Sequence, residues 1–435
     1  MSLNSPSTSH RLRVLINAHD FSPTQGSECG AAWNIATRVT LYHDVTVICA
    51  SGSQVRPDAY KEAWEEYLKE HSAIPGLQVV FVDQPRLARR ISALNRWLSG
   101  MSDGVGSRPL FYCALRAWHR CAAQRVRELG LADVDVIHHL NPTAYWGAGL
   151  LWKMHKPYCW GPLAGMVTMP LRFARWLGWR HVAFEVFRKV SLGAASLMMR
   201  GPLRKAAVVW VVTEAEAKLV RRVSGRRVRL MTDTASSPGA SVRIRQFDGS
   251  RTLLVCWSGL HIHRKALPIL LHAVASSLQA HRMHVTVLGG GVETKEWRRL
   301  AERLGIKTRI SWVGTVPRAE ALAHMAKADI FVHTSLREST PHVVLEALAM
   351  GLPVVCHDTC GMAVAVDSRC GIKVPFIGPA ESVQSFREIL EMFLGSPELL
   401  AELSAGALER AGELTWDSKA AEIAATYGEC VTTTY

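Results

Sequence analysis

Several features that would mark a particular class of protein are missing from this chain of 435 residues. It has no run of about eighteen apolar residues, so no segment is expected to cross a membrane as a helix. The polar segment 1–10 lacks the apolar core of a signal peptide, and we therefore expect a cytoplasmic protein. The ten cysteines form no C-x-x-C pair, and none has histidine partners at zinc-finger spacing, so they are interpreted as reduced, mostly buried thiols.

Acidic residues are scarce relative to basic ones: 37 Asp and Glu stand against 51 Lys and Arg, which gives a net charge of +14. This surplus predicts an anionic partner, such as nucleic acid, acidic lipid or a phosphorylated small molecule. It is concentrated in two stretches. Residues 85–130 contain nine arginines and two acids, and residues 170–205 contain eight basic residues and one acid.

Both basic stretches have the composition of helices that lie on an anionic membrane surface. In the first, one helical stripe of apolar residues runs beside a row of arginines: Leu87, Ile91, Leu94 and Leu98 beside Arg86, Arg89, Arg90 and Arg96. Tryptophans accompany the two stretches, namely Trp97, Trp118, Trp176 and Trp179. The alternative is an ordinary amphipathic helix whose arginines are simply solvated. The presence of two such stretches favours membrane contact over the solvated helix.

The chain is long enough for two domains and reads as α/β throughout, because short β-branched runs alternate with helical patterns. In the first half we expect strands at 13–16, 45–49, 79–82, 134–138, 158–160 and 208–212. An aperiodic stretch at 232–250 marks the domain boundary. Strands are then expected at 253–257, 285–288, 310–313, 330–333 and 354–356, and helices at 267–280, 295–304, 319–326 and 342–350. This pattern predicts two Rossmann-like domains with a ligand site in the cleft between them.

The most informative segment is 331–355, which reads as strand, polar loop, helix and strand. Ser339 or Thr340 can cap the helix, Pro341 suits its first position, and Gly351 can end it. The start of this helix would attract an anion such as a diphosphate.

Two carboxylates, Glu338 before the helix and Glu346 within it, accompany this anion site. Carboxylates do not bind phosphate, but they suit sugar and ribose hydroxyls. Their spacing resembles the E-x7-E motif of the retaining glycosyltransferases of family 4, which have the two-domain GT-B fold. The continuation A-L-A-M-G-L-P-V-V at 347–355 also resembles that family, as do S-G-L-H-I-H-R-K at 258–265, L-G-G-G at 288–291 and W-V-G at 312–314.

The resemblance implies a role for each matching residue. Lys265, with Arg264, would clamp the donor diphosphate and offset the charge of the leaving group. Glu338 would touch the donor sugar near the reacting carbon, and Glu346 would bind ribose hydroxyls. The remaining donor-binding positions are Gly259, Gly291, Val313, Gly314, Thr340, Pro341 and His342. The chain has Leu260 where many relatives carry an arginine, so the second cation would come from Arg264.

The first domain resembles the family less sharply. Gly26 and Ser27 open a helix after the first strand, where the family keeps a glycine-rich loop facing donor phosphate and acceptor; a helix start without a ligand is the alternative. Leu140 stands where several relatives place a histidine that lines the reaction site, so His139 or Asn141 would substitute for it.

The function implied is a retaining, metal-independent transfer of a hexose-type sugar from a nucleotide sugar to a lipid-linked saccharide at the inner membrane face, in exopolysaccharide or cell-surface polysaccharide synthesis. No aspartate cluster suggests a metal site, and no cofactor beyond the nucleotide-sugar substrate is expected. The expected domains are 1–238, basic and membrane-facing; 239–414, binding the nucleotide sugar; and 415–435, a helix crossing back to the first domain or an ordinary terminal helix. The alternatives are a sugar-nucleotide 2-epimerase of the same fold, a catalytically inactive sugar-nucleotide sensor and a nucleic-acid-binding protein, although no nucleic-acid motif is present.

Overall fold

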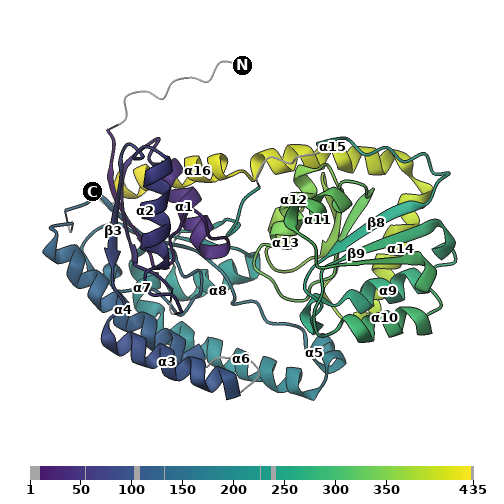
Figure 1. Ribbon diagram of the computed structural model, residues 1–435, viewed down its shortest axis with the longest axis horizontal. Helices are drawn as coiled ribbons and strands as arrows, with labels where there is room; N and C mark the ends of the chain where they lie inside the picture. Colours follow the sequence, from purple (N-terminus) through teal and green to yellow (C-terminus); the bar gives the residue numbers. More distant parts are fainter. Residues whose placement is uncertain are drawn as a thin grey trace.

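The computed structural model describes residues 10–53, 55–101, 108–131, 133–225, 227–236 and 242–432, which form two α/β lobes (Figure 1). The first lobe contains a seven-stranded parallel sheet in the order β3-β2-β1-β4-β5-β6-β7. Its strands are β1 (Arg13–Ala18), β2 (Asp44–Ala50), β3 (Leu77–Val82), β4 (Val136–Asn141), β5 (Tyr158–Leu163), β6 (Ala206–Val211) and β7 (Arg227–Leu230). The helices of this half are α1 (Ser27–Val39), α2 (Ala59–Glu70), α3 (Arg86–Met101), α4 (Arg108–Glu128), α5 (Leu171–Leu177), α6 (Trp179–Met198), α7 (Arg200–Lys205) and α8 (Glu214–Ser224).

The second lobe contains a six-stranded parallel sheet in the order β10-β9-β8-β11-β12-β13. Its strands are β8 (Leu253–Ser258), β9 (Met283–Leu288), β10 (Ile310–Gly314), β11 (Ile330–His333), β12 (Val354–His357) and β13 (Gly371–Val374). The remaining helices are α9 (Leu267–Ala275), α10 (Thr294–Arg303), α11 (Arg318–Met325), α12 (His342–Ala349), α13 (Met362–Ala365), α14 (Pro379–Gly395), α15 (Pro397–Glu413) and α16 (Trp416–Thr432).

The predicted α/β fold with two parallel sheets is confirmed, and every predicted strand forms. The edge strands β7 and β13 were not predicted, because each has only four residues and β7 alternates arginine with apolar residues. The helix predicted at 267–280 was too long and ends at Ala275. The serines that follow bind local groups instead: the Ser276 hydroxyl donates to the carbonyl of Ala273, and the Ser277 hydroxyl accepts from the amide of Gln279. Such bonds compete with helix continuation.

Helices α5 and α6 form an arm that runs along one edge of the molecule and joins the lobes (Figure 1). Phe173 on α5 is fully buried in the core of the second lobe, where its ring stacks on Phe376 with centroids 4.6 Å apart. Met169 and Ala174 lie in the same core. Residues that precede the expected boundary at 238 therefore help to form the core of the second lobe.

The C-terminal helix α16 lies on the first lobe and packs against α1 (Figure 1). Its residues Trp416, Ala420 and Ile423 share a core with the first sheet. The hydroxyl of Tyr427 lies 2.6 Å from Nδ1 of His138 on β4. The chain thus passes from the second lobe back to the first at its last helix.

None of the described helices is both long and apolar enough to cross a membrane. All ten cysteines are free thiols, and eight of them are buried.

Candidate functional site

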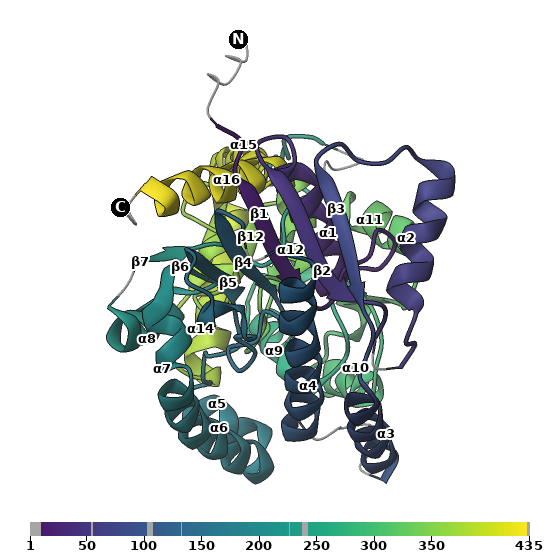
Figure 2. The ribbon, with the colours of Figure 1, turned by 90° about the vertical axis from the view of Figure 1, so that its left-hand side faces the viewer.

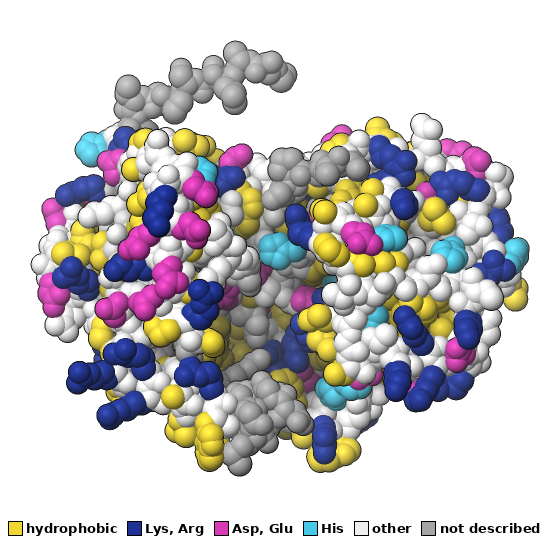
Figure 3. Space-filling model, in the orientation of Figure 1, with side chains coloured by type: hydrophobic (Ala, Val, Ile, Leu, Met, Phe, Trp, Pro, Cys, Tyr) yellow, Lys and Arg dark blue, Asp and Glu magenta, His cyan; other side chains and the backbone are white. Residues whose placement is uncertain are grey.

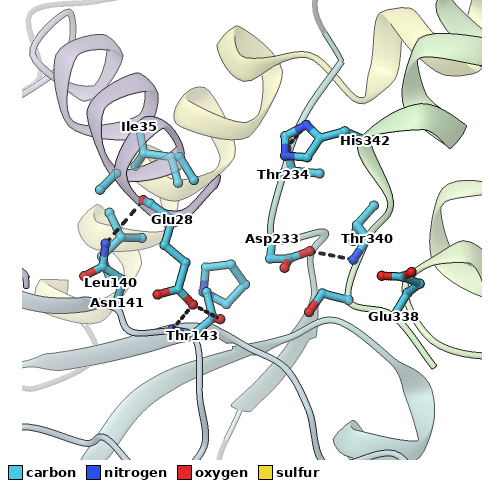
Figure 4. A pocket seen from close by; sticks show the side chains of 14 residues that line it. Glu28, Ile35, Leu140, Asn141, Thr143, Asp233, Thr234, Glu338, Thr340 and His342 are labelled. Atoms are coloured by element: carbon cyan, nitrogen blue, oxygen red, sulfur yellow. Dashed lines mark hydrogen bonds between the residues drawn. The ribbon is translucent and has the colours of Figure 1, made fainter. Parts of the chain in front are cut away.

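A cavity lies between the lobes and is lined by residues of both (Figure 4). In the space-filling view the surface is hollowed at the junction of the two lobes (Figure 3). The first lobe contributes α1, the end of β4 and the turn around Pro162 on β5. The second lobe contributes the loop between β11 and α12, and the segment between the lobes contributes Asp233 and Thr234. The lining residues are Glu28, Ala31, Ala32, Ile35, Leu140, Asn141, Thr143, Pro162, Asp233, Thr234, Glu338, Ser339, Thr340 and His342.

The start of α12 forms the second-lobe wall of this cavity. The predicted cap was wrong, because Pro341 itself occupies the N-cap position and no side chain caps the helix. Thr340 is buried, and its hydroxyl has no hydrogen-bond partner among the described residues. The helix ends as expected, since Gly351 follows it with a φ of +71°, which favours glycine. The helix start thus offers an uncapped, partly positive end and an unpaired hydroxyl.

Two cations meet one carboxylate beside the helix start. Arg264 Nη1 lies 2.8 Å from Glu338 Oε1, and Lys265 Nζ contacts the same oxygen. Burial lowers the pKa of the Lys265 ammonium, and the charge of Glu338 opposes this effect. Two positive charges against one negative charge leave an excess of one cation here. The structure therefore brings Lys265, Arg264 and Glu338 together, and Glu338 lines the same cavity as Thr340. This group is suited to an anion that also carries hydroxyls.

The glycine-containing loops after β8, β9 and β10 lie against one another. Gly259 N donates to Leu288 O at 3.1 Å, and Gly289 N donates to Gly314 O at 2.8 Å. Gly289 has a φ of +104°, and a Cβ there would lie 2.1 Å from the Gly259 carbonyl oxygen. Close backbone approach therefore requires glycine at Gly289. These loops place Gly259, Gly291 and Gly314 at the carboxyl edge of the second sheet, where open parallel sheets bind ligands.

Glu346 and Val313 are not among the residues that line the cavity, and neither are Lys265 and Arg264. Glu346 is on α12 and forms an ion pair with Arg318, whose Nη2 lies 2.6 Å from Glu346 Oε1. A ribose hydroxyl would have to share this carboxylate with Arg318. Val313 on β10 is half-buried against the core that contains α12.

On the first lobe, Gly26 is the N-cap of α1 and is exposed. Ser27 begins the helix, but its side chain lies outside the described part of the structure. The neighbouring Glu28 reaches the cavity: its Oε1 accepts hydrogen bonds from the Thr143 hydroxyl at 2.6 Å and the Thr143 amide at 3.2 Å. Burial, followed by the charge of Asp20, raises the pKa of Glu28.

His139 and Asn141 take different positions at the end of β4. Asn141 lines the cavity, and its amide group bridges to Asp20, donating to the carbonyl at 2.7 Å and accepting from the amide at 3.0 Å. His139 is fully buried and is not among the lining residues. Its Nε2 contacts the carbonyl of Gly147, and burial lowers its pKa to about 3. His139 therefore stays neutral and packs behind the cavity wall.

Sequence reasoning missed the residues that the segment between the lobes brings to the site. Asp233 Oδ1 accepts a hydrogen bond from the Thr340 amide at 2.9 Å, and the Thr234 hydroxyl lies 3.1 Å from Nδ1 of His342 (Figure 4). Glu28 and Thr143 were missed as well. The one available signal was polar residues directly after a strand or at a helix start, which many loops share.

Within the described residues, no group of three or more His, Cys, Asp and Glu side chains is arranged to hold a metal ion.

Comparison with known proteins assigns a domain family to the second lobe. Residues 245–410 match the family model of Glycosyl transferases group 1. The chain is 34% identical over 178 residues to a D-inositol 3-phosphate glycosyltransferase of Streptomyces bingchenggensis, a match that covers 38% of each protein. The chain thus spans well under half the length of this curated relative.

Solved structures resemble the whole chain. Sucrose-phosphate synthase from Thermosynechococcus elongatus superimposes with a TM-score of 0.62 at 15% identity, covering 97% of this chain and all of the other. Anabaena HepE in complex with UDP superimposes with a TM-score of 0.57 at 17% identity, covering 96% of this chain and all of the other. The chain therefore has the GT-B fold and carries a glycosyl transferases group 1 domain over residues 245–410.

Proposed function

We propose that the chain is a retaining glycosyltransferase that moves a hexose-type sugar from a nucleotide sugar to a lipid-linked saccharide in exopolysaccharide or cell-surface polysaccharide synthesis. The observation that carries the proposal is that Lys265 and Arg264 both contact Glu338, which lines the cavity between the lobes just before α12. The group 1 domain contains all of these residues.

The diphosphate of the donor binds at the start of α12, where free amides and the helix dipole favour negative charge. Lys265 and Arg264 bind its oxygens and stabilise the negative charge that grows as the nucleoside diphosphate leaves. Glu338 then accepts hydrogen bonds from the sugar hydroxyls. Because the two cations are already held beside Glu338, little reorganisation is needed during the reaction.

The reaction exchanges one bond for another at the anomeric carbon. The bond from this carbon to the phosphate oxygen breaks, the acceptor hydroxyl oxygen forms the new glycosidic bond on the same face, and the hydroxyl proton passes to the departing phosphate. This route retains the anomeric configuration and uses no covalent enzyme intermediate. Lys265, Arg264 and the helix start supply the charge stabilisation, so the proposed mechanism is independent of metal.

The acceptor enters from the first lobe, where the cavity is lined by Glu28, Asn141 and Thr143. Glu28 accepts from both the hydroxyl and the amide of Thr143, which fixes its carboxylate on the wall opposite Glu338 (Figure 4). A carboxylate in this position can accept a hydrogen bond from a saccharide hydroxyl.

The protein works at the inner face of the cell membrane, held there by the two basic stretches. Helices α3 and α6 lie at the same end of the molecule (Figure 2). Three aromatic side chains there are strongly exposed: Trp97 is 62%, Trp179 76% and Phe187 68% accessible. Arg96 and Arg180 are neighbours of Trp97 and Trp179 in the sequence, and Figure 3 shows Lys and Arg along the lower edge of the first lobe. Exposed aromatic and basic residues together suit an anionic lipid surface.

Some residues of the expected membrane-facing pattern lie in the protein interior instead. Ile91 packs against Ala88, Ala114 and Ala117 between α3 and α4. Trp118 is fully buried and donates from Nε1 to the carbonyl of Val82 at 3.0 Å. One side of α3 therefore packs against α4, while Leu87, Leu94 and Trp97 remain exposed.

A panel of UDP-, GDP- and ADP-activated sugars, incubated with membrane lipid extract, tests the proposal through release of the nucleoside diphosphate. One donor should be turned over by the wild-type protein, and Lys265→Ala should lower the rate by about 100-fold or more, as loss of a transition-state cation does. Lys307→Ala serves as the control, because Lys307 is an exposed lysine of the same lobe that pairs with Glu302. Unchanged turnover in Lys265→Ala would contradict the assignment.

A further inference from the structure

The arm formed by α5 and α6 directly contacts the loop between β11 and α12, which we call the donor loop. Glu185 on α6 is only 1% exposed, and its Oε1 accepts a hydrogen bond from Arg337 Nη1 at 2.6 Å. Arg337 immediately precedes Glu338, the carboxylate that meets Lys265 and Arg264. One ion pair, between a buried carboxylate and a partly exposed guanidinium, thus connects a helix of the arm to the loop that carries the central carboxylate of the site.

Glu185 is fixed in place by its own part of the chain. Its Oε2 accepts a hydrogen bond from the amide of Met169 at 3.1 Å and lies 3.7 Å from Nε of Arg188. Arg188 in turn donates to the carbonyl of Gly165 at 3.2 Å. These contacts hold the carboxylate ready for Arg337 through residues that precede the group 1 domain in the chain.

The donor loop is held from two sides. On one side Arg264 Nη1 donates to the carbonyl of Arg337 at 2.9 Å, and the amide of Leu336 donates to the carbonyl of Arg264 at 2.9 Å. On the other side Glu185 binds the Arg337 side chain, whose guanidinium also lies 5.1 Å from the ring centroid of Phe184. The arm therefore supplies the outer support of a loop whose inner support is a proposed catalytic residue.

A second ion pair between the arm and the second lobe provides a comparison. Arg172 on α5 pairs with Glu381 on α14, but the two side chains are 57% and 37% exposed. Solvent screens such a pair, so its contribution is small. Glu185 is buried while Arg337 is 27% exposed, so removing Arg337 leaves a buried charge without compensation. The Glu185–Arg337 pair should therefore govern the loop far more than the Arg172–Glu381 pair does.

We infer that Glu185 is a positioning residue for the donor site. Through its ion pair with Arg337 it fixes the position of the donor loop, and thereby the position of Glu338 beside Lys265 and Arg264. The affinity of the site for a nucleoside diphosphate consequently depends on a helix of the arm, outside the group 1 domain. This inference rests on the proposed function in that it takes the donor to bind at this loop.

The experiment measures binding of UDP, GDP and ADP by calorimetry to the full-length wild-type protein and to variants. Glu185→Gln and Arg337→Met should each weaken binding of the preferred nucleotide by about tenfold, a typical size for coupling between linked groups. The double variant should be no weaker than either single one, because the two residues act as a pair. Glu381→Gln, the matched control on the exposed pair, should bind within about twofold of the wild type.

Amide hydrogen exchange of the loop at 336–340 gives a second readout that needs no nucleotide. Exchange should be faster in Glu185→Gln and Arg337→Met than in the wild type and in Glu381→Gln. If the wild-type protein binds no nucleotide, the proposed function fails, while unchanged exchange in Glu185→Gln separately overturns the positioning role.

Arg337→Lys is a conservative variant that separates loss of the ion pair from loss of folding. Lysine keeps the positive charge near Glu185, so this variant should bind nucleotide better than Arg337→Met, with the difference appearing in the donor KM rather than in kcat. Equal binding by Arg337→Lys, Arg337→Met and the wild type would overturn the inference, as would equal nucleotide affinity in Glu185→Gln and Glu381→Gln.

Discussion

The carboxylate of Asp233 accepts a hydrogen bond from the amide of Thr340, with 2.9 Å between Oδ1 and N. Asp233 lies in the segment between the lobes, and Thr340 lies just before α12. The start of a helix attracts anions, so this carboxylate occupies a position that the donor diphosphate would also favour. We therefore expect Asp233 and a donor diphosphate to compete for the same amide.

Replacing Asp233 with Asn should tighten binding of the nucleoside diphosphate by roughly fivefold, since the amide oxygen keeps the hydrogen bond while the repelling charge is lost. Calorimetric titration measures the effect. Asp417→Asn is the control, because Asp417 is an exposed residue of α16 that pairs with Arg38. Weaker binding in Asp233→Asn would show that this carboxylate supports the donor.

Glu28 should act on the acceptor side of the reaction. In Glu28→Gln the Thr143 contacts can persist, but a saccharide hydroxyl loses its charged acceptor. We expect the KM for acceptor to rise by about tenfold with the donor KM unchanged, because a charge-assisted hydrogen bond contributes roughly 1.5–3 kcal/mol. Steady-state kinetics with each substrate varied separately decides the matter; a rise confined to the donor KM would assign Glu28 to the other substrate. Glu214→Gln is the control, because Glu214 is an exposed residue of α8.

The exposed aromatic residues of α6 should carry lipid binding. The double variant Trp179→Ser and Phe187→Ser should sediment with anionic vesicles at least about fivefold less than the wild type. Burying each large apolar side chain contributes a free energy of roughly 1.5–3 kcal/mol. Leu278→Ser is the control, since Leu278 is 95% exposed on the second lobe. Equal sedimentation of all three proteins with phosphatidylglycerol vesicles would show that this end of the molecule does not bind the membrane.

Lys419 should make stability depend on pH. Its ammonium on α16 is buried against Thr232 and Thr234, donating to Thr232 Oγ1 at 2.9 Å and to the Thr234 carbonyl at 3.0 Å. Burial lowers its pKa to about 7 from the ordinary value of 10.5. Below about pH 7 both the folded and the unfolded chain hold the proton. Between pH 7 and 10.5 the unfolded chain holds more protons, so the free energy of unfolding rises with pH, by at most about 1.4 kcal/mol per pH unit.

Urea unfolding of the wild type and Lys419→Met at pH 6.5, 8 and 9.5 checks this expectation. The wild type should gain stability relative to the variant as the pH rises, by roughly 3 kcal/mol over this range. Parallel pH profiles for the two proteins would mean that Lys419 titrates normally.

The sequence predicted best those features that depend on neighbours along the chain. The alternating strands and helices followed from local periodicity, and strand β11 has its predicted bounds. Lys265 and Glu338 were predicted as partners in one site through the family resemblance of their motifs, and the structure places these motifs after the adjacent strands β8 and β11.

Features that depend on tertiary contacts were beyond such reasoning. Nothing local shows that Asp233 binds the Thr340 amide, or that Glu185 meets Arg337 across 152 positions of sequence. The sequence left the choice between His139 and Asn141 open for a related reason, because a histidine at a strand end has the same local pattern whether it points into a cavity or into the core. Only the packing around Gly147 decides that it is buried.

The most direct test is a crystal structure of the wild-type protein with its nucleotide-sugar donor or the corresponding nucleoside diphosphate. Density for the diphosphate should lie between the lobes, within hydrogen-bond distance of Lys265 and the start of α12, with Asp233 displaced from the Thr340 amide. A nucleotide bound elsewhere on either lobe, or one that leaves Lys265 paired only with Glu338, would contradict the assignment of this cavity as the donor site.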